Sequence, residues 1–293
     1  MNSPVRTKPQ AVRAALRRGG APELVATGRR WLAGQLYPGG IPAPPPPVAK
    51  PRKPRKPAPP MVSAGDASFE ALQKFFAPRR ASYERLADAI APYLPRDGVM
   101  FDIGGNVGYF TKVVTERCGF QGVVHLFEPV PRLAGYIPRT LEGLPLAALS
   151  VHAFGLGETD DSFQMWLGKG NLGWNTLIAD RATEDMDETT VRIRRFDGLG
   201  LQVRPDLVKI DVEGAEYLVL RGLLGVLATW QPRPVLLCEI GWGTGHPEWE
   251  KELVVLDELL ALGYRATDLD GAPIDLRAIE RTTDVLFLPV ERN

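Results

Sequence analysis

The spacing of apolar residues changes period several times along the chain, and these changes predict alternating helices and strands. Apolar residues at helical spacing predict a helical lead-in over residues 66–97, which ends near Pro95. After residue 98, short continuous apolar runs, typical of buried strands, alternate with longer segments of helical period. The predicted strands cover 98–103, 122–129, 149–156, 206–212 and 234–241, and the predicted helices cover 106–118, 131–143, 215–230 and 248–263.

This alternation indicates an α/β domain over residues 98–293, in which helices cover both faces of a parallel sheet. The last two predicted strands, 264–271 and 283–290, are too close together for a crossover helix, so we expect the last strand to be antiparallel. A polar insertion at 157–197 interrupts the alternation and contains two predicted hairpin strands, 162–167 and 190–195. Because long loops in compact domains are often functional, we expect this insertion to cover an acceptor.

Residues 1–65 differ from the rest of the chain in composition. Their proline-rich, basic stretch 41–60 has almost nothing to bury, so we expect a disordered tail. Residues 1–60 carry twelve Lys or Arg and one acidic residue, a net charge of +11 that the rest of the chain balances. The tail is interpreted either as a flexible arm or as a tether to an anionic surface or partner protein. Nucleic acid is not an expected partner, because no aromatic residue interleaves with the basic run 50–56.

The two cysteines bear on the compartment. Cys118 and Cys238 lie in apolar runs and lack metal-site spacing, so neither a disulfide scaffold nor a zinc site is expected. No apolar run reaches the roughly 18 residues that span a bilayer. The basic N-terminus also lacks the apolar segment of a secretory signal. We therefore expect a reduced, cytoplasmic protein without a transmembrane segment.

The stretch DIGGNVG, residues 102–108, joins a predicted strand to a predicted helix. Glycines in such a loop allow a sharp turn and close approach of the backbone to a ligand. The carboxylate of Asp102 would repel a pyrophosphate and attract a sulfonium or ammonium group, which favours S-adenosylmethionine over NAD. The candidate cofactor-binding residues of this loop are Asp102, Gly104, Gly105, Asn106 and Gly108.

Two further stretches complete a recognisable set. Glu128, in FEP at 127–129, ends the next strand, where an acid can accept hydrogen bonds from both ribose hydroxyls. KIDVEGAE follows at 209–216 and leads into an apolar helix. In this order and spacing, DIGGNVG, FEP and KIDVEGAE resemble the FkbM family of S-adenosylmethionine-dependent methyltransferases, over roughly residues 80–290.

The resemblance implies a Rossmann-like class I methyltransferase fold, with a seven-stranded, mostly parallel sheet and an antiparallel last strand. It also implies O-methylation, usually of a hydroxyl on a sugar, glycan or natural product. Such a hydroxyl needs a general base or a metal to remove or acidify its proton.

Asp211 and Glu239 are the first candidates for that task. They end successive strands at the edge of the sheet where ligands bind, so the two carboxylates could lie side by side and hold Mg²⁺. Alternatively, Asp211 and Glu213 cap the helix that begins near Gly214.

His246 and Lys209 are the remaining catalytic candidates. His246 lies in a predicted loop and is interpreted either as a general base or as a surface residue. Lys209 shares a strand face with Asp211, so it either pairs with a carboxylate at the site or neutralises one in the fold.

The leading interpretation is an S-adenosylmethionine-dependent O-methyltransferase for a small-molecule or glycan acceptor. One alternative is an NAD-dependent sugar-modifying enzyme, which Asp102 and Asn106 disfavour. The other is a non-catalytic methyltransferase-like binding module tethered by the basic arm, which the intact DIGGNVG, FEP and KIDVEGAE stretches disfavour.

Overall fold

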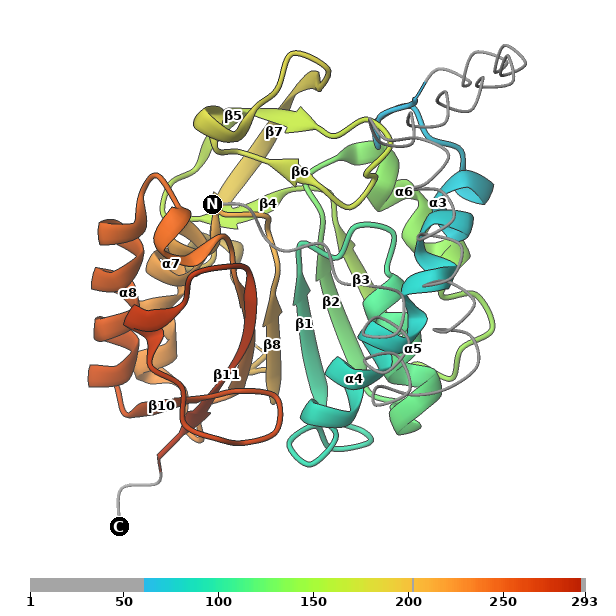
Figure 1. Ribbon diagram of the computed structural model, residues 1–293. Helices are drawn as coiled ribbons and strands as arrows, with labels where there is room; N and C mark the ends of the chain where they lie inside the picture. Colours follow the sequence, from blue (N-terminus) through green and yellow to red (C-terminus); the bar gives the residue numbers. More distant parts are fainter. Residues whose placement is uncertain (1–60, 202, 291–293) are drawn as a thin grey trace, which may run out of the picture. The chain divides into compact units, whose positions relative to one another are not determined.

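Two β-sheets organise residues 61–201 and 203–290, the part of the chain that the computed structural model describes (Figure 1). The strands are β1 (Val99–Ile103), β2 (Val123–Phe127), β3 (Ala148–His152), β4 (Gly155–Gly157), β5 (Asp161–Leu167), β6 (Asn175–Thr176), β7 (Asp187–Arg195), β8 (Leu207–Ile210), β9 (Val235–Ile240), β10 (Tyr264–Thr267) and β11 (Thr283–Pro289). The α-helices are α3 (Phe69–Phe76), α4 (Arg80–Ile90), α5 (Tyr109–Cys118), α6 (Pro131–Thr140), α7 (Glu216–Thr229) and α8 (Trp249–Ala261). Short 3₁₀ helices cover Ala77–Arg79, Ala179–Arg181, Asp197–Leu199, Gly243–Gly245 and Leu276–Ala278.

The main sheet has seven strands in the order β10-β11-β9-β8-β1-β2-β3. Strands β3, β2, β1, β8 and β9 pair in parallel, whereas β11 is antiparallel to both β9 and β10. The predicted α/β fold with an antiparallel last strand is therefore confirmed, and the topology is that of a class I methyltransferase. Because the order reverses beside β1, the loops after β1 and β8 face the crevice where such sheets bind ligands.

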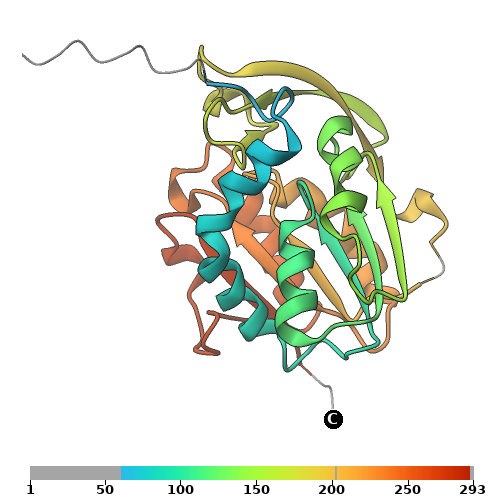
Figure 2. The ribbon, with the colours of Figure 1, turned by 90° about the vertical axis from the view of Figure 1, so that its right-hand side faces the viewer.

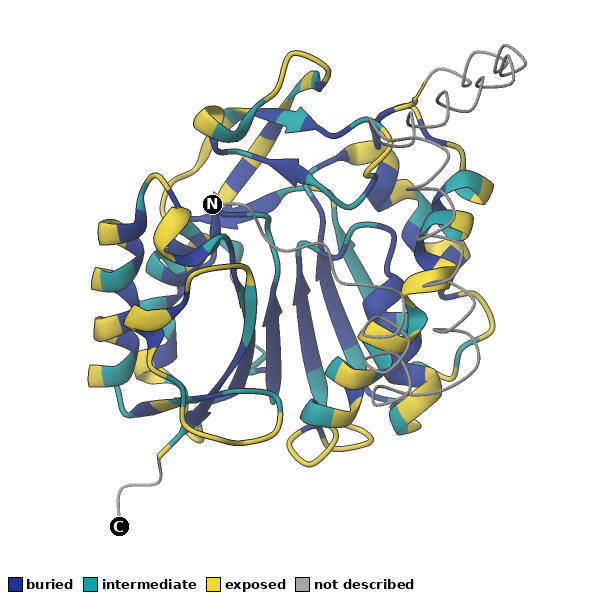
Figure 3. Cartoon of the chain, in the orientation of Figure 1, coloured by how far each residue is buried: buried dark blue, intermediate teal, exposed yellow. Residues whose placement is uncertain are grey.

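Helices cover both faces of the main sheet (Figures 1 and 2). Successive side chains of β1 alternate between the faces, so Met100 packs in the core under α3 to α6 and Phe101 in the core under α7 and α8. Both side chains are fully buried. Burial of one such side chain stabilises the fold by about 1.5–3 kcal/mol. Figure 3 shows the resulting pattern, with buried residues along the central strands and exposed residues on the outer helix faces.

The second sheet has the order β4-β7-β5-β6 and forms most of the insertion. The predicted hairpin is confirmed, since β5 and β7 pair antiparallel from Asp161 opposite Ile193 to Leu167 opposite Asp187. The single strand predicted over 149–156 is wrong. The chain leaves the main sheet after His152, and β4 pairs in parallel with β7. One apolar run thus contributes a strand to each of two sheets. The spacing of its apolar residues does not indicate this division.

Two helices, α3 and α4, form the lead-in that precedes β1. Ser68 caps the start of α3, since its Oγ accepts a hydrogen bond of 3.2 Å from the backbone N–H of Ala71. None of the described helices is long and apolar enough to cross a membrane. The domain boundaries stay a prediction, and residues 1–60 of the predicted basic tail lie outside the described residues.

Candidate functional site

The loop between β1 and α5 turns sharply at the carboxyl edge of the main sheet. Gly104 and Gly108 have φ values of 75° and 81°, and Asn106 between them has a φ of 51°. A Cβ on Gly104 would clash with the Asp211 carbonyl oxygen. The absence of a side chain at Gly104 therefore allows the loops after β1 and β8 to pack together. Gly104, Gly105 and Asn106 line one pocket, whereas Gly108 begins α5 with left-handed backbone and does not line it.

Glu128 lies beside this loop and is buried. Its Oε2 accepts a hydrogen bond of 2.9 Å from the backbone N–H of Asn106, and its Oε1 accepts one of 2.8 Å from Val130. Burial raises the pKa of Glu128 to about 8, although the two backbone donors oppose the shift. Each carboxylate oxygen keeps a second lone pair, so Glu128 can still accept hydrogen bonds from a ligand in the pocket that it lines.

Lys209 links the loops after β1 and β8. Its Nζ lies 3.4 Å from Asp102 Oδ1 and 3.2 Å from Asp211 Oδ2, and it donates a hydrogen bond of 3.1 Å to the Gly104 carbonyl. Although burial alone would lower the pKa of Lys209, the carboxylates of Asp211 and Asp102 raise it above its ordinary value. Lys209 is therefore a fixed cation that holds the site together through two ion pairs and one hydrogen bond.

The structure corrects the expected position of Asp102. Its carboxylate was expected to face the ligand, but it is fully buried and is not among the described residues that line the pocket. Asp102 Oδ2 accepts a hydrogen bond of 2.7 Å from Thr111 Oγ1 in α5, while Oδ1 faces Lys209. Asp102 therefore acts through Lys209, because the lysine lies at the pocket wall and the carboxylate behind it.

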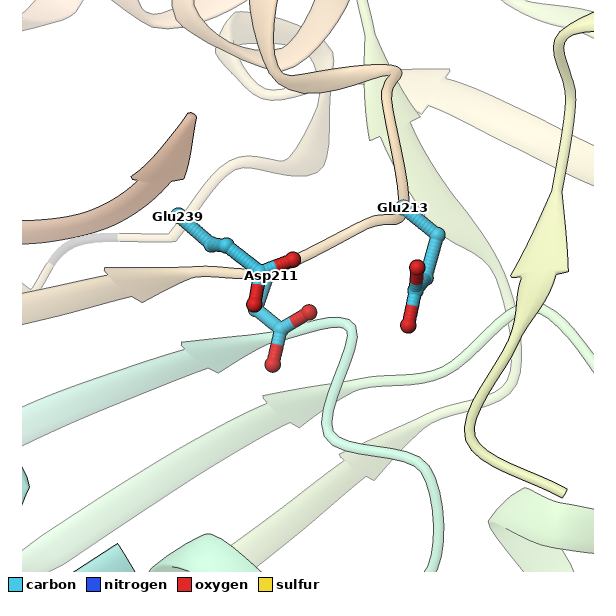
Figure 4. A group of neighbouring side chains, drawn as sticks. All are labelled: Asp211, Glu213 and Glu239. Carbon is cyan, nitrogen blue, oxygen red and sulfur yellow. The ribbon is translucent and has the colours of Figure 1, made fainter. Parts of the chain in front are cut away.

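Three carboxylates gather where β8 and β9 end. Ligand oxygens of Asp211, Glu213 and Glu239 all lie within 4.8 Å of one another. Figure 4 shows Asp211 and Glu213 on the loop that follows β8, and Glu239 on the neighbouring strand. Burial and the neighbouring negative charges, that of Asp211 first among them, raise the pKa values of Glu213 and Glu239. The cluster therefore attracts either protons or a cation.

No side chain of the described residues caps α7, and a different acid, Glu216 at its first position, holds the loop before the helix. Its Oε1 accepts hydrogen bonds from the backbone N–H groups of Val212, at 3.0 Å, and Gly214, at 3.1 Å. The alternative that Asp211 and Glu213 cap this helix is therefore wrong. Glu213 instead lines the pocket with a φ of 52°, so its backbone adopts a conformation that few non-glycine residues take.

The structure removes His246 from the proposed catalytic group. The residue is buried, not at the surface, and it is not among the described residues that line the pocket. Its Nε2 lies 2.7 Å from the Gly214 carbonyl oxygen, and its Nδ1 accepts a hydrogen bond of 2.9 Å from the Glu248 backbone. Nε2 must carry the proton to donate to a carbonyl, so neither nitrogen is free to accept a proton from a substrate. His246 instead positions the loop before α8 against Gly214.

The pocket is closed by elements that come from outside the parallel sheet. Tyr83 of α4 and Tyr109 of α5 line it, and burial together with the nearby Asp211 charge raises the pKa of Tyr83. The small sheet supplies Gly155, Leu156, Met165, Asn175 and Ile193. The insertion therefore covers the site, and it places groups that the sequence pattern did not single out beside the predicted ones.

Family comparison agrees with these motifs. The family model of the Methyltransferase FkbM domain matches residues 102–266, which is more than half of the 293 residues. The chain belongs to the FkbM methyltransferase family. The match begins at Asp102 and ends in β10, so it contains both the glycine loop and all three carboxylates of the acidic cluster.

Two curated relatives are similar to part of this chain. Methyltransferase 1 from Beauveria bassiana (strain ARSEF 2860) is 31% identical over 154 residues, which cover 46% of this chain and 61% of that protein. The AMB antimetabolite synthetase AmbE from Pseudomonas aeruginosa is 32% identical over 171 residues, which cover 44% of this chain and 8% of that protein. The match thus spans less than two thirds of either relative.

The solved structures that match this chain are more distant in sequence. A methyltransferase FkbM from Methylobacillus flagellatus KT is 15% identical with a TM-score of 0.44, over 66% of this chain and 44% of that one. An O-methyltransferase from Bacillus cereus, solved in complex with SAH, is 13% identical with a TM-score of 0.43, over 74% of this chain and 87% of that one.

Proposed function

We propose that this FkbM domain is an S-adenosylmethionine-dependent O-methyltransferase that acts on a hydroxyl of a sugar, glycan or secondary metabolite. One observation carries the proposal: a single pocket joins the glycine loop and Glu128 to Asp211 and Glu213. A nucleoside-binding half and a proton-accepting half thus face the same space. Transfer to a hydroxyl requires both, because the donor must be held in line with a nucleophile that loses its proton.

The residues of the first half fit S-adenosylmethionine. Gly104 and Gly105 bring backbone to the pocket wall, and the buried Oδ1 of Asn106 has no hydrogen-bond partner among the described residues. Glu128 can accept from the ribose hydroxyls. Pro129 and Leu156 line the pocket with apolar surface that suits a purine ring. When bound, S-adenosylmethionine would supply an activated methyl group.

The second half supplies the acid–base chemistry. We assign Asp211 as the general base, because Lys209 holds its carboxylate at the pocket wall. Glu213 and Glu239 flank it. Of these two, Glu213 lines the pocket and accepts a hydrogen bond from the acceptor. Lys209 is a positioning residue in this scheme, since it fixes Asp211 relative to Gly104 and the cofactor loop.

A divalent cation is a second proposal for the same cluster. Carboxylate oxygens are the ligands that Mg²⁺ prefers, and it usually keeps several waters in enzyme sites, so Asp211 and Glu239 would suffice. A bound cation would offset the mutual repulsion of the cluster and acidify the acceptor hydroxyl. Loss of turnover in EDTA, restored by Mg²⁺, supports this proposal; undiminished turnover in EDTA assigns the proton transfer to the carboxylates alone.

The central experiment is calorimetric titration of the purified chain with S-adenosylhomocysteine and, separately, with NAD⁺. We expect binding of the first and none of the second. Methyl transfer from labelled S-adenosylmethionine to a panel of sugars and hydroxylated metabolites then tests O-methylation. Binding of NAD⁺ alone would favour the NAD-dependent enzyme, and no binding of either ligand would favour a non-catalytic module.

A further inference from the structure

The carbonyl oxygen of Leu172, in the loop before β6, accepts two side-chain hydrogen bonds. Asn106 Nδ2 in the cofactor loop donates to it at 3.3 Å, and Asn175 Nδ2 in β6 donates at 3.4 Å. The two amide nitrogens therefore lie no further apart than the sum of these distances. A residue of the insertion thus stands beside the cofactor loop, although the two asparagines are far apart in the sequence.

This carbonyl also determines which way both amides point. An oxygen of either side chain turned toward Leu172 would face another acceptor, so both amides must present their nitrogens to it. Their Oδ1 atoms are left as acceptors. Both Oδ1 atoms are buried and lack a hydrogen-bond partner among the described residues.

Asn175 is the more deeply buried of the two, and only 6% of its surface is exposed. Its backbone is held in the small sheet opposite Leu167, and it lines the same pocket as Asn106 and Glu128. An unpaired polar atom at such a depth costs about 1–3 kcal/mol. A ligand that donates a hydrogen bond to Asn175 Oδ1 would remove that cost.

We propose that Asn175 is a cofactor-binding residue, whose Oδ1 accepts a hydrogen bond from a hydroxyl or ammonium group of S-adenosylmethionine. This inference rests on the proposed function. The cofactor is the occupant because Asn175 shares the Leu172 carbonyl with Asn106, whose own backbone N–H binds Glu128. Asn175 therefore lies at the cofactor end of the pocket, and the insertion binds the donor as well as covering the acceptor.

The next strand residue holds the insertion in place over the site. Thr176 is fully buried, and its Oγ1 donates a hydrogen bond of 2.7 Å to the carbonyl of Glu213. Strand β6 is thereby tied to the cofactor loop through Leu172 and Asn106, and to the acidic loop through Thr176. Asn175 stands between these two attachments, so its side chain has a defined position before a ligand binds.

The test compares Asn175→Leu with a matched variant of the exposed neighbour, Asn171→Leu. Leucine has a similar size and removes the acceptor, while Asn106 still satisfies the Leu172 carbonyl. Calorimetry measures the affinity of each protein for S-adenosylhomocysteine and for 5′-methylthioadenosine, which lacks the amino-acid part. Asn175→Ala serves as a second variant, and the melting temperature without ligand monitors folding.

We expect Asn175→Leu to weaken S-adenosylhomocysteine binding on the order of 10-fold to 100-fold, and Asn171→Leu to leave it unchanged. An equal loss with 5′-methylthioadenosine assigns the contact to a ribose hydroxyl, and a loss with S-adenosylhomocysteine alone assigns it to the ammonium group. Wild-type affinity in folded Asn175→Leu or Asn175→Ala overturns the inference and spares the proposed function. Failure of the wild-type chain to bind S-adenosylhomocysteine overturns both.

Discussion

The two halves of the pocket are built in opposite ways. The centre of the cofactor half is a pair of loops close together in the chain, in which Glu128 accepts hydrogen bonds from the backbone of Asn106 and Val130. The acidic half brings Glu239 from another strand toward Asp211 and Glu213, and these carboxylates repel one another. The first half is stabilised by its own contacts, whereas the second is held together by the surrounding fold.

This difference separates binding from chemistry. A preformed set of backbone contacts suits a cofactor that is the same in every cycle. A cluster of like charges instead stores unfavourable energy that a proton or a cation relieves. We therefore expect substitutions in the acidic half to change turnover, and substitutions in the cofactor half to change folding and cofactor affinity.

The largest expected effect is on turnover. Asp211→Asn keeps the size of the side chain but removes the proposed base, so turnover should fall on the order of 10²–10⁴-fold. Affinity for S-adenosylhomocysteine should stay within about 3-fold of wild type, because each half binds separately. Steady-state methyl transfer and calorimetry measure the two quantities. Asp180→Asn, in an exposed 3₁₀ turn, is the control; unchanged turnover in Asp211→Asn would remove Asp211 from the mechanism.

The next effect is on stability in the cofactor half. Gly104→Ala places a Cβ against the Asp211 carbonyl in left-handed backbone, which should lower the free energy of unfolding by about 3 kcal/mol or more. Gly119→Ala is the matched control, because its φ of 65° is similar and a Cβ there meets no described atom within 4 Å. It should cost about 1–2 kcal/mol. Urea unfolding compares the two variants, and equal losses would show that close packing of the loops after β1 and β8 is unimportant.

The smallest effect is a pH dependence of stability. A carboxyl group with a raised pKa in the folded state stabilises the fold below its ordinary pKa, and that contribution is lost as the pH rises through the raised value. Glu239 in the acidic cluster and Glu252 in α8 both belong to this class, and burial raises the pKa of Glu252 to about 9. Stability should therefore fall between about pH 5.5 and pH 8.5.

The two glutamates give matched variants for this prediction. Glu239→Gln and Glu252→Gln should each make the fall in unfolding free energy smaller, because each removes one group that loses its proton only at raised pH; urea unfolding at both pH values measures this. Only Glu239→Gln should also lower turnover, since Glu239 lies within 4.8 Å of the proposed base Asp211 and Glu252 does not belong to that acidic cluster. A flat stability profile in the wild-type chain would mean that the acidic cluster carries no excess repulsion.

Most of the fold was predictable from local patterns. Strand runs such as 98–103 are apolar on both faces, and the short connection before the last strand allows only an antiparallel return. The predicted strand over 149–156 was wrong because the spacing of apolar residues indicates that a segment is buried, but not which sheet it joins. The structure divides that run between β3 and β4.

The site residues that could be predicted from the sequence are those that lie at the ends of strands. Glu128 and Asp211 both line the pocket at the ends of their strands. His246 was a catalytic candidate only because it lies in a predicted loop. Its hydrogen bond to the Gly214 carbonyl is a tertiary contact that the local sequence does not indicate. Asn175 had no local signal, because a single asparagine in a polar insertion resembles any turn residue.

By itself, the sequence determined the alternating fold, the glycine turn and the acids at the strand ends, because these depend on residues close together in the chain. The tertiary structure alone decided which groups face the ligand. It placed Asp102 behind Lys209, turned Glu216 onto the loop before α7 and brought Asn175 beside Asn106. Such choices depend on distances between segments far apart in the sequence, and those distances are set by the packing of the two sheets.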